Sequence, residues 1–171
     1  VWTNASGNTL LASLLGTTYK NIIVDCDIQG ATNYINLNSL TIAGKLKIVR
    51  SGNGNVLIAN STTTFVCAAY EQTGGNIIIN RQATTDRSMR VTGDAAISGG
   101  VLYLKYNASS NSLTSLGNLS VAGNVYFTGG TMTNDAASGQ TVSTVSPQLI
   151  FNGTAAQVFF KSSDATFGSP Q

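Results

Sequence analysis

A short pattern that recurs along the chain constrains the fold more than any other feature of the sequence. Three segments align without gaps: residues 89–104 (MRVTGDAAISGGVLYL), 119–134 (LSVAGNVYFTGGTMTN) and 149–160 (LIFNGTAAQVFF). Their starts are 30 residues apart both times. Each copy has apolar residues at its first and third positions and glycine at its fifth. A fixed period of this length is typical of proteins built from structural repeats.

Looser copies of the pattern occur upstream. LTIAGKLKI starts at Leu40, TFVCAAYEQTGGNIII starts at Thr64, and NIIVDCDIQG at residues 21–30 is interpreted as a degenerate first copy. Counted together, the copies start near residues 22, 40, 64, 89, 119 and 149. The changes in spacing fall in polar segments, which is where loops tolerate changes of length.

Within each copy the apolar residues alternate with polar or small ones, and this alternation predicts β-strands. Leu119 and Val121, for example, would face the same side of a strand. Gly-Gly pairs at 74–75, 99–100 and 129–130 indicate places where the chain turns. The inward residues predicted from this register are Leu40, Ile42, Met89, Val91, Leu119, Val121, Leu149 and Phe151.

Together these features predict an all-β fold, a right-handed parallel β-solenoid of about five to six coils with an N-terminal cap. Stacked copies would place each strand about 4.8 Å from its equivalent and bury the apolar positions as continuous ladders. We expect residues 1–20, which include Trp2 and the stretch LLASLL, to form the cap. Residues 21–160 would form the coils, and residues 161–171 a tail or the start of a further coil. The competing antiparallel β-sandwich gives no reason for a repeated 30-residue register.

The composition excludes several classes of function. Charged residues make up only 9% of the chain, against about 25% in a typical soluble domain, and the formal net charge is +2. There is no histidine, so histidine-based triads, acid–base pairs and metal sites are excluded. Lysine and arginine are not clustered, so binding of nucleic acid through phosphate contacts is not expected. No apolar run approaches the roughly 18 residues of a membrane-spanning helix.

The segments SLTIAGKLKI, EQTGGNIIIN, LSVAGNVYFTGGTMT and LIFNGTAAQVFF resemble the repetitive secreted proteins of Bacteroidetes. In those proteins, copies of an L-x-V-x-G-N-F-x-x-(T/S)-G-G-T-like pattern form β-solenoid parts of surface proteins and adhesins. Many of them carry a C-terminal signal for type IX secretion. The resemblance covers residues 17–160, and no sorting domain is recognised after Phe167. It implies an extracellular or cell-surface bacterial protein without shared catalytic residues.

The acidic residues offer two candidate sites. Asp25 and Asp27 would share one face of a strand, as a calcium site or a pair of glycoside-cleaving carboxylates requires. No third acid lies nearby in the sequence, so we favour solvent-facing positions that alternate with inward Val24 and Cys26. Glu71, the only glutamate, precedes a Gly-Gly pair and is expected to be solvated at the edge of a strand.

The basic residues form two loose groups. Lys45, Lys47 and Arg50 would lie along one strand, where they could contact an acidic polysaccharide or prevent edge-to-edge pairing of sheets. The second group consists of Arg81, Arg87 and Arg90 around Asp86. For both groups we favour protection of exposed strands over binding of a ligand.

Cys26 and Cys67 are the only cysteines, and an even pair in an exported chain would invite a disulfide. They belong to copies that are two coils apart. That separation would be about 10 Å, beyond the roughly 7 Å limit between the Cα atoms of bonded cysteines. We therefore predict two unpaired cysteines.

The sequence thus predicts a non-enzymatic structural or adhesive module, acting as a stiff stalk or as the protomer of an extracellular filament. No catalytic, cofactor-binding or metal-binding residues are predicted. We expect residues 149–160 to form a sheet edge with unpaired backbone groups. Neighbouring coils of a longer chain, or other subunits, are expected to cover this edge. Surface glycans or proteins are further expected partners. The alternative is a carbohydrate-binding or polysaccharide-cleaving β-helix protein, and the fold does not decide between the two.

Overall fold

The computed structural model describes residues 18–27, 30, 34–37, 40–59, 64–82, 84–107, 115–136 and 148–168. This part of the chain forms β-strands and contains no helix, so the predicted all-β class is confirmed. Most of the predicted cap, residues 1–17, lies outside the described residues. The strands are β1 (Thr18–Tyr19), β2 (Ile22–Cys26), β3 (Tyr34–Asn36), β4 (Thr41–Ile42), β5 (Lys45–Ser51), β6 (Asn55–Leu57), β7 (Thr64–Cys67), β8 (Ala69–Gln72), β9 (Asn76–Asn80), β10 (Arg87–Val91), β11 (Ala95–Asn107), β12 (Gly117–Val121), β13 (Val125–Ala136), β14 (Leu149–Phe151), β15 (Phe159–Lys161) and β16 (Ala165–Phe167).

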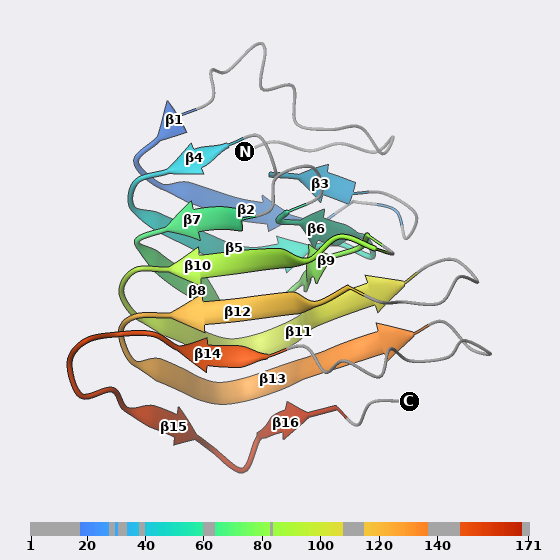
Figure 1. The fold of residues 1–171 in the computed structure, drawn as a ribbon. Helices are drawn as coiled ribbons and strands as arrows, with labels where there is room; N and C mark the ends of the chain where they lie inside the picture. The colour runs from blue at the N-terminus through green and yellow to red at the C-terminus, as the bar shows by residue number, and fades with distance from the viewer. Residues whose placement is uncertain are drawn as a thin grey trace.

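Neighbouring strands run parallel throughout the described part of the chain. One sheet has the strand order β14-β12-β10-β7, and a second has the order β2-β5-β8-β11-β9-β6-β3. The second sheet continues through β13, which pairs with β11 and also with β15 and β16. Strands β1 and β4 form a small third sheet. The sheets curl around a shared interior in the manner of a half-barrel (Figure 1).

The register of the strands follows the sequence repeat. Met89 of β10 lies beside Leu119 of β12, and Leu119 lies beside Leu149 of β14. In the second sheet, Val125 of β13 lies beside Phe159 of β15. Partners between β10, β12 and β14 are therefore equivalent residues of successive copies, whereas Val125 and Phe159 depart from the 30-residue spacing and Ile22 of β2 lies beside Leu46 and not beside Leu40. The antiparallel pairing that a β-sandwich requires does not occur among the strands described.

Most of the residues predicted to face inward belong to the core. The buried ones are Leu40, Ile42, Met89, Val91, Leu119 and Val121. Leu149 is partly buried and packs against this core. The prediction is wrong for Phe151, whose side chain is 42% exposed. Val121 covers one side of Phe151, but β14 is the last strand of its sheet, so no described strand covers the other side.

The Gly-Gly pairs turn the chain between β8 and β9 and within the long strands β11 and β13. Gly75, Gly100 and Gly130 have φ values of 73°, 78° and 81°, in the left-handed region that favours glycine. A Cβ atom on Gly100 would also lie 2.2 Å from the carbonyl oxygen of Gly75. Turns from successive copies therefore lie directly against one another, and only glycine fits at the contact.

Side-chain oxygens connect successive copies where the backbone ladders end. Asp94 Oδ1 accepts a hydrogen bond from the backbone N–H of Asn124 (2.7 Å), and Asn124 Oδ1 accepts one from Val158 (2.9 Å). The acceptors of this kind belong to Asn21, Asp86, Asp94, Asn118 and Asn124. Asparagine and aspartate at the strand ends thus satisfy backbone N–H groups that the sheets leave without a partner.

Candidate functional site

The carboxylates of Asp25 and Asp27 are exposed, as predicted, and both contact Arg50 of the neighbouring strand β5. Arg50 Nε lies 2.5 Å from Asp25 Oδ1, and Arg50 Nη1 lies 3.3 Å from Asp27 Oδ2. The hydrogen bond from Arg50 lowers the pKa of Asp25. A glycoside-cleaving pair needs one carboxyl that environment holds protonated. A solvated pair that shares one guanidinium does not provide it, so these residues form a surface ion-pair cluster.

Glu71 of β8 joins the other two basic residues of the same face. Its carboxylate lies 2.6 Å from Lys47 Nζ and 2.9 Å from Lys45 Nζ. Hydrogen bonds from Lys47 and then Lys45 lower the pKa of Glu71. Glu71, expected to be simply solvated at an edge, therefore holds two lysines together. The predicted basic stripe is neutralised by acids on the strands beside it and does not offer free positive charge to an acidic ligand.

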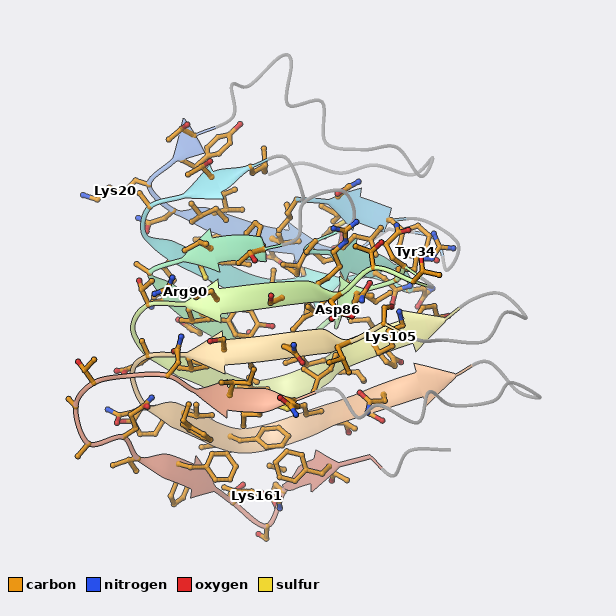
Figure 2. The ribbon with its side chains drawn as sticks, viewed as in Figure 1. Lys20, Tyr34, Asp86, Arg90, Lys105 and Lys161 are labelled. Atoms are coloured by element: carbon orange, nitrogen blue, oxygen red, sulfur yellow. The ribbon has the colours of Figure 1, made fainter. Side chains whose placement is uncertain are left out.

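The second basic group, around Asp86, does not come together. Arg81 lies over the ring of Tyr34, 4.5 Å from its centroid. Arg87 is buried, whereas Arg90 on the same strand is exposed. Figure 2 shows Asp86 and Arg90 at opposite ends of β10. These side chains do not form one binding surface.

The structure instead contains a buried polar cluster that consists of Asn80, Gln82, Lys105 and Ser115. Lys105 Nζ donates to Ser115 Oγ (2.5 Å) and to the carbonyl oxygen of Gln82, and Ser115 Oγ donates to the same carbonyl (2.6 Å). Asn80 Nδ2 donates to the carbonyl oxygen of Leu116 (2.6 Å). It also lies 3.4 Å from Ser115 Oγ. The cluster ties the segment after β9 to the segment that leads into β12.

A lysine amine beside a serine hydroxyl is also the arrangement that some hydrolases use to activate a nucleophile. Burial lowers the pKa of Lys105 to about 8, although the nearby charge of Asp86 opposes this shift. However, Ser115 donates its hydrogen to a backbone carbonyl, and Lys105 and Ser115 are only 3% and 1% exposed. The burial and the hydrogen bonds of the two side chains support a structural role, in which the cluster joins two segments of the chain.

The sequence patterns do not predict this cluster. Strict alternation along β11 places Leu104 inside and Lys105 outside, but both are buried. The register of β11 against β13 shifts between Tyr103 and Lys105, and this irregularity turns the lysine inward. The available signal was the run VLYLKY, in which one lysine interrupts apolar and aromatic residues.

The two cysteines lie in different sheets, on β2 and β7, and both are buried and free. This confirms the prediction that Cys26 and Cys67 are unpaired. Burial raises the pKa of Cys67 to about 12, so its thiol stays protonated and unreactive. Tyr70 is also buried, and its hydroxyl donates to Gln72 Oε1 at 2.7 Å.

Three phenylalanine rings are exposed together at the C-terminal edge of the sheets, which we define as β14, β15 and β16. These residues, Phe151, Phe159 and Phe167, form the aromatic edge cluster, with exposed fractions of 42%, 42% and 48%. The ring centroids of Phe151 and Phe159 are 5.8 Å apart, and those of Phe159 and Phe167 are 6.3 Å apart. Their parallel partners are the buried residues Val121, Val125 and Met132. The rings thus occupy positions equivalent to core positions, and no described strand covers them on one side.

Comparison with known proteins does not assign the chain to a family. No family model, no curated protein and no solved structure matches the chain. Within the described residues, no group of three or more histidine, cysteine, aspartate or glutamate side chains is placed to hold a metal ion. In the same part of the chain, no helix is long and apolar enough to cross a membrane.

Proposed function

We propose that the protein is a non-enzymatic structural module, a right-handed parallel β-solenoid whose coils are the repeat copies. One observation carries the proposal: equivalent residues of the copies that start at 89, 119 and 149 pair in parallel in the first sheet, and those of the copies at 89 and 119 pair in parallel in the second. A chain in which each copy bonds chiefly to its neighbours extends along one axis and resists bending. Such a module serves as a stiff spacer or an adhesive stalk.

The packing of the side chains supports the same proposal. Phe65, Met89 and Leu119 lie side by side on successive strands, and all three are buried. The charged residues on the outer face of β2, β5 and β8 are paired with one another. An apolar interior that continues from copy to copy, enclosed by a neutralised exterior, favours a mechanical role over a catalytic one.

We place this module in a secreted or cell-surface bacterial protein, because its repeats resemble those of Bacteroidetes adhesins. Serine, threonine and asparagine make up 56 of its 171 residues. An exterior rich in hydroxyl and amide groups suits contact with surface glycans or with other proteins. Further coils of a longer chain, or other subunits, are the proposed neighbours along the axis.

Mechanical unfolding of single molecules tests the proposal. We expect extension in steps of about 100 Å, because one 30-residue copy spans at most about 3.6 Å per residue when extended. A single low-force event with no steps of this size would contradict a repeat-by-repeat architecture. Polysaccharide cleavage by the purified chain that is lost in Asp25→Asn but retained in Asp164→Asn, a matched exposed acid, would favour the enzymatic alternative instead.

A further inference from the structure

Lys105 carries a buried amine that neutral groups surround. Its side chain is 3% exposed, and Nζ donates hydrogen bonds to Ser115 Oγ and to the carbonyl oxygen of Gln82. Asp86 acts on this amine through its charge, but no carboxylate of the described residues forms an ion pair with it. A buried charge without an ion-pair partner is costly. Joining two segments does not by itself account for a lysine here, because a neutral side chain would do so at a smaller cost.

Asn80 lies beside this amine. Asn80 and Lys105 face each other in register on the parallel strands β9 and β11, and the asparagine side chain is fully buried. Asn80 Nδ2 lies 3.4 Å from Ser115 Oγ, and Lys105 Nζ lies 2.5 Å from the same oxygen. The amine and the side-chain amide therefore meet at one hydroxyl group.

We propose that Lys105 and Asn80 condense into an isopeptide bond, a covalent cross-link between β9 and β11. The ammonium first gives up a proton to water, and the neutral Nζ then attacks Asn80 Cγ and forms a C–N bond. The bond from Cγ to Nδ2 breaks, and Nδ2 leaves as ammonia with a proton from the attacking amine. The two side chains supply every atom, so no oxidant, reductant or further reactant is needed. This inference goes beyond the proposed function and rests on the contacts of this cluster.

The contacts of the cluster match the needs of this reaction. The backbone N–H of Gln82 donates to Asn80 Oδ1 at 2.7 Å, where negative charge develops when the amine attacks. Ser115 Oγ contacts both nitrogens, so its hydroxyl, once turned from the carbonyl of Gln82, transfers a proton from the amine to the leaving group. The carbonyl oxygens of Thr85 and Leu116 accept hydrogen bonds from Asn80 Nδ2 at 3.0 Å and 2.6 Å, which holds the amide in place.

The protonation state of Lys105 also suits the reaction. Burial lowers the pKa of Lys105 to about 8, although the charge of Asp86 opposes this shift. At mildly alkaline pH a large share of this lysine is therefore a neutral nucleophile, whereas a lysine with the ordinary pKa of 10.5 is mostly protonated there. The lowered pKa describes the chain before the reaction, because the amide nitrogen of the product does not titrate.

A cross-link at this position has a mechanical consequence. It closes a loop from residue 80 to residue 105, so this segment no longer extends when the chain is pulled from its ends. The fully stretched chain becomes shorter by about 90 Å, since about 25 residues span at most about 3.6 Å each. The remaining copies still extend step by step.

Intact-mass spectrometry tests the proposal. A chain kept well below the pKa of Lys105, about 8, retains the free amine, and incubation for days above that pH should lower its mass by one ammonia molecule. Trypsin does not cleave after an acylated lysine. Digestion of the incubated chain should therefore yield residues 51–81 joined to residues 91–161, a branched peptide that identifies both ends of the new bond.

Three variants separate the roles of the side chains. Lys105→Met should abolish the mass loss, and Ser115→Ala should slow it by about 100-fold, because a positioned proton-transfer group contributes about 10²–10⁴-fold. The matched control is Lys20→Met, the same substitution at an exposed lysine on the other side of the molecule (Figure 2). It should leave the mass loss unchanged. Far-UV circular dichroism and a urea midpoint confirm that each variant is folded, and the branched peptide of the wild type does not depend on any substitution.

Three results would overturn the proposal. The first is a mass that stays constant during the alkaline incubation, and the second is the same loss of ammonia in Lys105→Met. The third is a loss that maps to Asn53 or Asn152, each of which precedes a glycine and can release ammonia by cyclising onto the backbone. None of these results affects the stepwise extension of the other copies under force. Failure of the cross-link and failure of the structural role are therefore distinguishable.

Discussion

Equivalent positions in the middle of the sheets and at their C-terminal edge differ in burial although their sequence pattern is the same. Val121 and Phe151 occupy the third position of successive copies and lie side by side in register. Val121 is fully buried, whereas Phe151 is 42% exposed. Strand β14 covers Val121, whereas no described strand covers the far side of Phe151. In this fold the burial of a side chain depends on the next copy as much as on the strand that carries it.

The largest expected effect contrasts these two positions directly. Val121→Asp would place an unpaired carboxylate among buried apolar side chains, at a cost of about 5 kcal/mol or more, and we expect loss of the cooperative unfolding transition. Phe151→Asp should cost only about 1 kcal/mol, because roughly half of the ring already contacts water. Urea unfolding followed by circular dichroism, at a concentration where the chain is monomeric, measures both.

Ser120→Asp controls for the charge itself, since Ser120 lies on the same strand on the opposite face. It should shift the urea midpoint far less than Val121→Asp. Equal destabilisation by Val121→Asp and Phe151→Asp would show that the edge is covered in solution, and the contrast between interior and edge would no longer stand.

The glycine turns test the contrast between the interior and the edge at backbone positions. Gly130 lies only one strand from the C-terminal edge, yet a Cβ atom there would meet the carbonyl oxygen of Gly100 at 2.6 Å, on the side of the preceding copy. We therefore expect Gly130→Ala and Gly100→Ala to cost similar amounts, about 2–3 kcal/mol each, from strain at positive φ and the blocked contact. Differential scanning calorimetry of the two variants, with Ser98→Ala as an exposed control, measures this. A much smaller effect at Gly130 would mean that the edge can relax and that its strands are loosely held.

How far the sequence predicts the fold follows from these examples. Alternation and the 30-residue register identify Met89, Val91, Leu119 and Val121 as core residues, because both signals are local or strictly periodic. Neither signal states where the sheet stops, so Phe151 is assigned to the core although no described strand covers its far side. The limit is physical, since burial at the edge depends on a neighbour that the pattern within one strand does not specify.

The charged residues show what the repeat spacing predicts and where the alternation of apolar residues fails. The copies that start at 40 and 64 are 24 residues apart, which places Lys47 beside Glu71, and these two residues do pair. The same spacing, applied to charged as well as apolar residues, predicts this ion pair. Alternation alone does not predict the burial of Lys105, because an irregularity in β11 breaks the pattern at that point.

The pH dependence of stability tests whether Lys105 is as enclosed as the interior positions. Its pKa in the folded protein, about 8, is below its ordinary value of 10.5, so the unfolded chain binds more protons between these values. The contribution of Lys105 to stability should therefore rise as the pH increases from about 8 to 10.5. We expect the difference in unfolding free energy between the wild type without the cross-link and Lys105→Met to rise across this window. Other groups titrate equally in both proteins, so a flat difference would mean that water reaches the ammonium.

The smallest expected effect lies on the outer face, where Glu71 bridges Lys45 and Lys47. Because this side chain is partly exposed, loss of its charge in Glu71→Gln should cost only about 0.5 kcal/mol at neutral pH. The two lysines lower the pKa of Glu71 in the folded protein, so the stabilisation is present above the ordinary pKa of 4.5 and disappears as the pH falls through the lowered value. Urea midpoints of wild type and Glu71→Gln should thus differ at pH 7 and converge as the pH falls below the lowered pKa of Glu71, and 1 M salt should reduce the difference at pH 7. The pair lies on β5 and β8, away from the C-terminal edge, so Phe159→Asp should leave this difference unchanged. Coupling between the two substitutions would show that the state of the C-terminal edge is transmitted through the sheet to its outer face.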